Sequence, residues 1–158
     1  MDSESYRNFM KVAFSEARQA YDNGEAPVGA VVVFEDHIIG RGHNQTRQFH
    51  DATAHAEMIA LSAAYEHFGD WRLENCTLFC TLEPCPMCAG AAMLSRIKTI
   101  VYGAADPKFG ACGSILDIPS ETRFNHQIEI VSSVMEAEAA ELMQRFFRRL
   151  RKNKEEIN

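Results

Sequence analysis

A histidine, a glutamate and two cysteines stand in two short stretches of the sequence and could together form a hydrolytic metal site. His55 and Glu57 are separated by one residue, and Cys85 and Cys88 by two. One imidazole and two thiolates are ligands that zinc prefers, and a catalytic zinc has three protein ligands, which leaves a fourth position for water. The sequence therefore predicts a zinc site with ligands His55, Cys85 and Cys88, in which Glu57 moves the protons of the reaction.

Each half of this pattern also fits another interpretation. A Cys-x-x-Cys pair between a strand and a helix is typical of a thioredoxin-like redox site, and a lone histidine in a first helical turn is commonly a cap or a core residue. A structural zinc would need a fourth ligand, but the candidates His43, His50, Cys80 and Cys112 lack the spacing of a closed site. The combination of both halves favours the catalytic zinc site, and Cys76, Cys80 and Cys112 are then small core or loop residues.

The elements that must position these residues alternate between helices and strands. Apolar residues recur at helical spacing from Ser3 to Asn23, and two β-branched runs joined across Glu35-Asp36 predict a hairpin. Such alternation predicts a layered α/β domain around one mixed sheet. The expected strands are 28–34, 37–42, 77–81, 99–103 and 127–131. The first expected helix is 3–23, the second is capped by Asp51 or Thr53 and runs to about 68, and the third runs from Pro84 to about 95. A weak helical stretch is expected after the loop 109–114, and a last helix from about 135 to 154.

This layout brings two helix starts together at the metal ligands. It places His55 in the first turn of one helix and Cys85 and Cys88 in the first turn of the next, three residues apart and so on one face. The partial positive charge and free N–H groups of helix N-termini favour thiolates and any oxyanion formed nearby.

Length and composition favour one cytoplasmic domain over residues 1–158. The chain is 46% hydrophobic, enough to bury a sizeable core, and it has no apolar run that could span a bilayer and no secretory signal. Its five cysteines are then expected as thiols, not disulfides. The net charge of −6 argues against a general nucleic-acid surface, but residues 145–154 hold six basic residues and no acid, which suggests one defined polyanion contact.

The two stretches resemble the signature of the zinc-dependent nucleoside and nucleobase deaminases. Further segments along nearly the whole chain are similar to the bacterial tRNA adenosine deaminase (TadA) family. The segments that carry this resemblance are Pro27-Val28-Gly29-Ala30-Val31, Gly42-His43-Asn44, Thr53-Ala54-His55-Ala56-Glu57, Thr81-Leu82-Glu83-Pro84-Cys85-Pro86-Met87-Cys88-Ala89-Gly90-Ala91, Asp106-Pro107-Lys108, Gly110-Ala111-Cys112-Gly113-Ser114 and Phe146-Phe147-Arg148.

The resemblance implies a three-layer α/β/α cytidine-deaminase-like fold with a central mixed five-stranded sheet. It implies hydrolytic deamination of adenosine to inosine at the wobble position of a tRNA anticodon, with an arginine tRNA as the expected substrate, one zinc ion per subunit and a homodimer. Glu57 would carry the proton to N1 of the adenine and then to the leaving ammonia. The other residues that it implies in substrate binding are Val28, Asn44 and Ala56 around the base, and Asp106, Lys108, Phe146, Phe147 and Arg149 on the RNA of the anticodon stem-loop.

Two other functions remain open at this point. One is a deaminase of a free guanine, cytosine or nucleoside, which would share the zinc chemistry without needing the basic C-terminal residues. The other is a zinc or thiol module that binds RNA without catalysis. The chain also departs from the family at Cys80, where a valine is common, and at Ala105 and Pro107, positions that are expected to vary and that lie in the loop 104–114 expected to touch the substrate.

Overall fold

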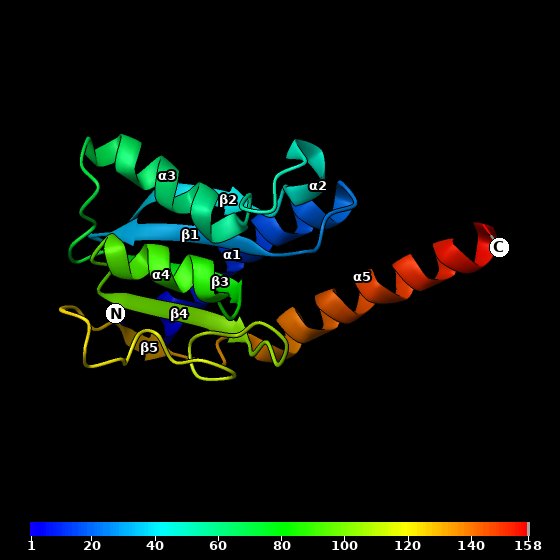
Figure 1. Cartoon of the computed structure of the whole chain (residues 1–158). Helices are drawn as coiled ribbons and strands as arrows, with labels where there is room; N and C mark the ends of the chain where they lie inside the picture. The colour runs from blue at the N-terminus through cyan, green and yellow to red at the C-terminus, as the bar shows by residue number, and fades with distance from the viewer. Residues whose placement is uncertain (158) are drawn as a thin grey trace.

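The computed structural model describes residues 1–157 as a mixed β-sheet between two layers of helices (Figure 1). Strand order is β2-β1-β3-β4-β5, with β1 antiparallel to both neighbours and β3, β4 and β5 parallel. This confirms the expected mixed five-stranded sheet. The strands are β1 (Gly29–Phe34), β2 (His37–His43), β3 (Thr77–Leu82), β4 (Thr99–Ala104) and β5 (Glu129–Val131), and the helices are α1 (Ser3–Asp22), α2 (Thr46–Phe49), α3 (Ala56–Phe68), α4 (Pro86–Leu94) and α5 (Glu136–Ile157).

Alternate residues of the central strands face opposite helix layers. In β1, Ala30 and Val32 belong to the core beneath α3 and α4, whereas Val31 and Val33 belong to the core beneath α1 and α5. Because both faces of the sheet are buried, the strand reads as a continuous apolar run and not as an alternating one. The three-layer α/β/α arrangement expected from the sequence is therefore confirmed.

Glycines in β2 let α3 lie unusually close to the sheet. A Cβ at Gly42 would stand 2.3 Å from the carbonyl oxygen of Ala56, and one at Gly40 would stand 2.2 Å from that of Ala60. Both distances are too short for any side chain, so the two glycines determine how deep α3 sits. The first residue of α3 is Ala56, and the depth of this helix consequently sets the position of His55 just before it.

The predicted hairpin is present, but two predicted helix starts are wrong. Glu35 and Asp36 both have positive φ, as a tight turn between twisted strands requires. Helix α3 is capped by His55 and not by Asp51 or Thr53, because the Asp51 carboxylate instead accepts hydrogen bonds from the N–H and hydroxyl of Thr53.

Helix α4 likewise starts later than the sequence predicts. Pro86 and not Pro84 takes the first helical position, and Cys85 is the N-cap. The carbonyl oxygen of Pro84 accepts the N–H of Ala111, which ties this residue to a loop instead of to the helix.

The structure also corrects the irregular regions. The weak helical stretch expected after residue 114 is wrong, because that segment forms turns and a single bridge between Cys112 and Asp117. The short helix α2 was not expected. Its first N–H groups, from Arg47 and Gln48, bond to the carboxylate of Glu25, which is distant in the sequence.

Helix α5 packs on the sheet by its first half and projects beyond the body with its second half (Figure 1). Arg149 lies where the helix leaves the body. Its guanidinium donates to the carbonyl oxygen of Tyr21 at 2.8 Å and stacks over the ring of Tyr21 at 4.0 Å. Residues 151–157 are exposed. Within residues 1–157, no helix has the length and apolar character that crossing a membrane would require.

The glycine contact predicts that Gly42→Ala destabilises the protein. The added methyl group must push α3 away from β2, at a cost of roughly 1–3 kcal/mol of unfolding free energy. Urea unfolding measures the loss. Gly90→Ala is the matched control, because a Cβ there meets nothing within 4 Å and alanine favours the helix. Equal stability of Gly42→Ala and the unaltered protein would contradict the assigned close contact.

Candidate active site

A cavity of about 530 Å³ opens at the edge of the sheet where β3 and β4 end. The carboxyl ends of parallel strands are the usual place for ligands in such sheets. Here β3 leads into Glu83 and β4 leads into Asp106, and both residues line the cavity. Its other lining residues are Ala26, Val28, Asn44, Ala52, His55, Ala56, Glu57, Leu82, Cys85, Pro86, Met87, Phe109 and Met143.

The three predicted metal ligands converge at this cavity. The Nδ1 atom of His55 lies 3.5 Å from the Sγ atoms of both Cys85 and Cys88, and all three atoms lie within 4.8 Å of one another. A tetrahedral zinc, with bonds of about 2.0–2.1 Å to nitrogen and about 2.3 Å to sulfur, requires a nitrogen–sulfur separation of roughly 3.5 Å. The donor set therefore fits a zinc ion in both type and spacing.

Local structure explains why these side chains are free to meet. His55 and Cys85 are the N-caps of α3 and α4, and neither side chain makes a capping hydrogen bond. Cys88 lies one turn into α4, on the same side as Cys85 and buried. Two helix N-termini thus point at one place, which favours negative charge on the sulfurs.

The electrostatics of the cluster agree with this arrangement. The hydrogen bond from Cys88 lowers the pKa of the Cys85 thiol to about 4, and the same bond raises the pKa of Cys88 above its usual range. The hydrogen bond with Cys85 also raises the pKa of His55. The Cys85 sulfur therefore favours the thiolate form, and Cys88 keeps its proton. A divalent cation would take the place of that proton, because the thiolate is the form that binds metals.

Glu57 lies beside the cluster in the first turn of α3 and is buried. Burial raises the pKa of its carboxyl group to about 7. A carboxyl group near neutrality can both accept and return a proton. The position next to the cluster suits a proton carrier and not a fourth ligand, since Glu57 does not belong to the group of converging ligand atoms.

Asn44 offers an unpaired polar atom at the cavity. Its amide nitrogen donates to the carbonyl oxygen of Ala26, over a long 3.4 Å, while its Oδ1 atom is buried without a hydrogen-bond partner among residues 1–157. A buried acceptor left unpaired costs roughly 1–3 kcal/mol. Its lining position means that a donor group of a ligand in the cavity could satisfy it.

The buried carboxylate of Glu83 organises the loop on the other side of the cavity. Glu83 is 2% exposed and accepts the backbone N–H groups of Asp106, Cys112 and Ser114, as well as the hydroxyl group of Ser114. No cationic side chain pairs with it among the ion pairs of residues 1–157. The loop 106–114 is therefore held by one carboxylate through its backbone.

The structure brings some predicted substrate residues together and leaves others apart. Val28, Asn44, Ala56 and Asp106 line the cavity, and Lys108 is exposed close by in the same loop. The predicted residues of α5 lie outside the cavity lining and differ among themselves: Phe146 is 4% exposed and lies in the interior, Phe147 is 44% exposed, and Arg149 stacks on Tyr21.

Met143, Glu83 and Phe109 are among the lining residues that the sequence did not assign to the site. Met143 precedes the exposed Phe147 by one helical turn, so helical periodicity could have found it. Glu83 stands directly before the Pro-Cys motif, but no local pattern reveals that its carboxylate is buried. Phe109 lies in a glycine-flanked loop whose conformation depends on Glu83, and the sequence carried no signal for it.

Comparisons with known proteins agree with this geometry. The family model of MafB19-like deaminases matches residues 4–151. The tRNA-specific adenosine deaminase of Bacillus subtilis (strain 168) is 49% identical over 146 residues, which are 92% of this chain and 91% of the relative. A solved structure from studies of A-to-I editing by tRNA:A34 deaminases at the wobble position is 42% identical, with a TM-score of 0.82, and the match covers 85% of this chain and 98% of the other.

A second activity occurs among the structural relatives. The guanine deaminase of Bacillus subtilis is 38% identical, with a TM-score of 0.61, and the match covers 66% of each chain. The match to the guanine deaminase is thus shorter, and its TM-score is lower, than the match to the tRNA deaminase structure.

The role of Glu83 predicts that Glu83→Gln loosens the loop 106–114. Glutamine keeps the size of the side chain but has one oxygen fewer, so at least one backbone N–H loses its acceptor, at about 1–3 kcal/mol. Urea unfolding and amide hydrogen exchange of Asp106, Cys112 and Ser114 measure the effect. Glu121→Gln, on a half-buried residue outside the loop that pairs with Arg123, is the control and should leave exchange in the loop unchanged. Unaltered protection of all three amides in Glu83→Gln would contradict the role.

Proposed function

The chain belongs to the family of tRNA-specific adenosine deaminases within the MafB19-like deaminases, and on this premise we propose that it hydrolyses adenosine to inosine at the wobble position of a tRNA anticodon. The observation that carries the proposal is the convergence of His55, Cys85 and Cys88 at one cavity with the buried Glu57 beside them. The expected substrate is an arginine tRNA, recognised through its anticodon stem-loop.

We propose one zinc ion per subunit, held by His55, Cys85 and Cys88. The fit of the donor atoms supports this choice of metal. When bound, zinc would lower the pKa of a water molecule to about 7 and so supply the nucleophile for hydrolysis.

Glu57 is the proposed proton carrier of the reaction. Its carboxylate takes the proton of the water that attacks C6 of adenine and delivers a proton to N1. It then returns a proton to the amino group that leaves as ammonia. The overall reaction consumes one water, whose oxygen replaces the amino group at C6, and yields inosine and ammonia. Burial of Glu57 supports this role, because it keeps bulk water from exchanging with the carried proton.

Asn44, Val28 and Ala56 are the proposed contacts of the adenine. The unpaired Oδ1 atom of Asn44 supports a hydrogen bond to the base, and Val28 gives the cavity an apolar surface for the ring. An adenine in an anticodon loop is already outside a duplex, so its entry into the cavity has a low unstacking cost.

We propose that Asp106 and Lys108 in the loop, and Phe147 on α5, contact the RNA around that adenosine. Single-stranded RNA is bound by stacking and by phosphate contacts. Exposure of Lys108 and Phe147 supports the proposal. Phe146 and Arg149 support it indirectly, since they anchor α5 on the body beside Tyr21.

A deaminase of free guanine is the second candidate, favoured by the likeness to the guanine deaminase structure. A free base fits the same cavity, but its deamination would not require the projecting basic half of α5. Longer and more identical matches to tRNA deaminases favour the RNA substrate. We further propose that the protein acts in the cytoplasm, where its substrate occurs.

The role of Glu57 predicts that Glu57→Gln abolishes inosine formation but retains zinc. Loss of a general base typically lowers turnover by about 10²–10⁴-fold. Inosine formation on an anticodon stem-loop with adenosine at the wobble position is the assay, and metal analysis measures zinc. Glu66→Gln, at an exposed position of the same helix, is the matched control.

Two results would contradict the proposal. Full activity of Glu57→Gln would remove Glu57 from the reaction. If the zinc-loaded wild type forms no inosine on the stem-loop but converts free guanine, the protein would be assigned to the free-base deaminases instead.

We propose that the active form is a homodimer in which a neighbouring subunit completes the RNA site, as the family resemblance implies. Exposed apolar side chains at Leu94, Ile115 and Leu116 support the presence of a contact between subunits. Light scattering is expected to give twice the mass of the 17.8 kDa chain. A monomeric mass at concentrations where the enzyme is fully active would refute the dimer.

A further inference from the structure

Phe109 presents a large apolar ring to solvent at the mouth of the catalytic cavity. The residue is 67% exposed, and yet it lines the cavity together with Asp106 and Met143. A single exposed aromatic residue needs no explanation by itself. The position at the rim of a substrate cavity gives this one a possible function.

The backbone holds Phe109 in place. The carboxylate of Asp106 accepts the N–H groups of Lys108 at 2.9 Å and of Phe109 at 3.2 Å, and the carbonyl oxygen of Asp106 accepts the N–H of Gly110 at 2.9 Å. These bonds close a tight turn around Phe109. The ring is thus exposed on an ordered turn and not on a free loop end.

This turn is fastened to the same segment that holds the metal ligands. Glu83 bonds to the backbone on both sides of Phe109, and the N–H of Ala111 donates to the carbonyl oxygen of Pro84, one residue before Cys85. The turn packs tightly against Glu83 at Gly110, since a Cβ at Gly110 would stand 2.2 Å from Oε2 of Glu83. The distance between the Phe109 backbone and the reacting centre is therefore set by the fold.

We propose that Phe109 is a stacking platform for the nucleobase next to the reacting adenosine in the RNA. The inference rests on the proposed function, because it takes an adenosine in the cavity as given. When the adenine of this adenosine lies in the cavity, the adjacent nucleotide of the RNA must lie at the rim, where the face of the Phe109 ring is exposed. Stacking on an aromatic side chain contributes about 1–3 kcal/mol per base.

The charges around Phe109 favour a nucleotide over a protein partner. Lys108 precedes it and is exposed, so that a cation for a phosphate stands beside a ring for a base. The nearby acid, Asp106, is engaged by two backbone N–H groups. The Phe109 ring and the Lys108 cation therefore suit the base and the phosphate of one nucleotide, and the cavity suits the adenosine next to it.

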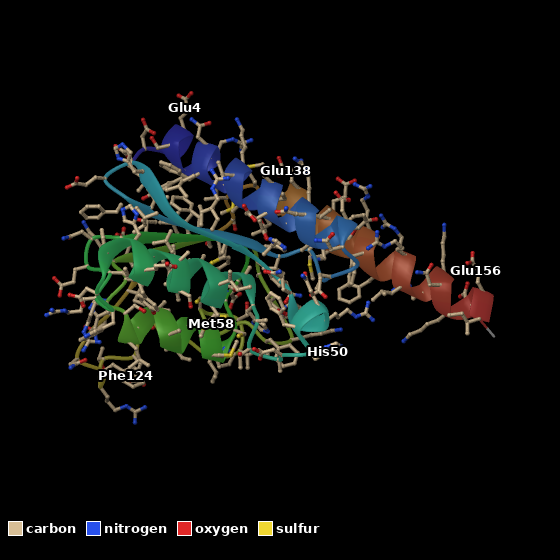
Figure 2. All side chains as sticks on the ribbon, turned by 90° about the horizontal axis from the view of Figure 1, so that it is seen from above. Glu4, His50, Met58, Phe124, Glu138 and Glu156 are labelled. Carbon is tan, nitrogen blue, oxygen red and sulfur yellow. The ribbon has the colours of Figure 1, made fainter. Side chains whose placement is uncertain are left out.

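Phe124 offers a matched control. It is 50% exposed, but it lies at the amino end of β4, since its neighbour His126 contacts the carbonyl oxygen of Ile97 at 2.7 Å. The cavity lies at the carboxyl end of that strand. Figure 2 shows Phe124 at the opposite end of the body from His50. His50 is close in sequence to Ala52, which lines the cavity.

The experiment is a double-substitution cycle between protein and RNA. Zinc-loaded full-length protein is assayed for inosine formation on the anticodon stem-loop and on the same RNA with an abasic nucleotide on one side or the other of the adenosine. We expect Phe109→Ala to raise KM for the intact stem-loop about tenfold at unchanged kcat. On one of the two abasic RNAs the same substitution should change KM by less than about twofold, because the stacking partner is already missing.

Two further variants define the contact. Phe109→Tyr keeps the ring face and should retain a KM close to that of the wild type. Phe124→Ala should behave as the wild type on every RNA.

Several results would overturn the inference. These are an unchanged KM in Phe109→Ala, an equal rise in KM on the intact and on both abasic RNAs, or a drop from dimer to monomer mass in Phe109→Ala, which would place the ring between two copies of the chain. Absence of inosine formation by the wild type would refute the proposed function itself, and the inference with it. Activity of the wild type without coupling between Phe109 and the base would refute the inference alone.

Discussion

The meeting of two helix N-termini at the carboxyl edge of the sheet is the constraint on which the rest of the structure depends. His55 and Cys85 both occupy N-cap positions with extended backbone, and neither side chain is used to cap its own helix. The side chains therefore turn toward each other, and Cys88 joins them from the first turn of α4. The depth of α3, set by Gly40 and Gly42, decides whether these three groups come within reach of one ion.

Two buried carboxylates fix the chain close to residues that line the cavity, since Glu25 precedes Ala26 and Glu83 is itself a lining residue. Glu25 holds the start of α2, and Glu83 holds the loop 106–114, in each case through backbone N–H groups. A buried carboxylate is tolerable when several donors surround it, and one that bonds to backbone also orders the chain that supplies the donors. The loop 106–114, which contributes Asp106 and Phe109 to the cavity lining, is thus fixed although its backbone is irregular.

Helix α5 joins the reacting centre to a surface beyond it. Its first half lies on the sheet and contributes Met143 to the cavity, while its second half leaves the body (Figure 1). Arg149 marks the transition, because its contacts with Tyr21 fasten the helix to the end of α1. The basic stretch is therefore divided, since Arg149 anchors the helix whereas Arg151 and Lys152 are exposed.

The sequence by itself determined the central sheet, its flanking helices and the cluster of His55, Glu57, Cys85 and Cys88. These features follow from short-range patterns: apolar runs in strands buried on both faces, helical spacing in α1, and ligand types at the spacing of one helical turn. Only the tertiary structure decided the starts of α3 and α4, the existence of α2, the shape of the loop 106–114 and which residues of α5 are buried. The physical reason is that most of these depend on a partner distant in the chain, which replaces the local hydrogen bonds that a sequence pattern can express: Glu25 for α2, Glu83 for the loop, Tyr21 for α5, and Ala111, which donates to Pro84, for the start of α4. The start of α3 depends on a local competition instead, because the Asp51 carboxylate accepts the N–H and hydroxyl of Thr53.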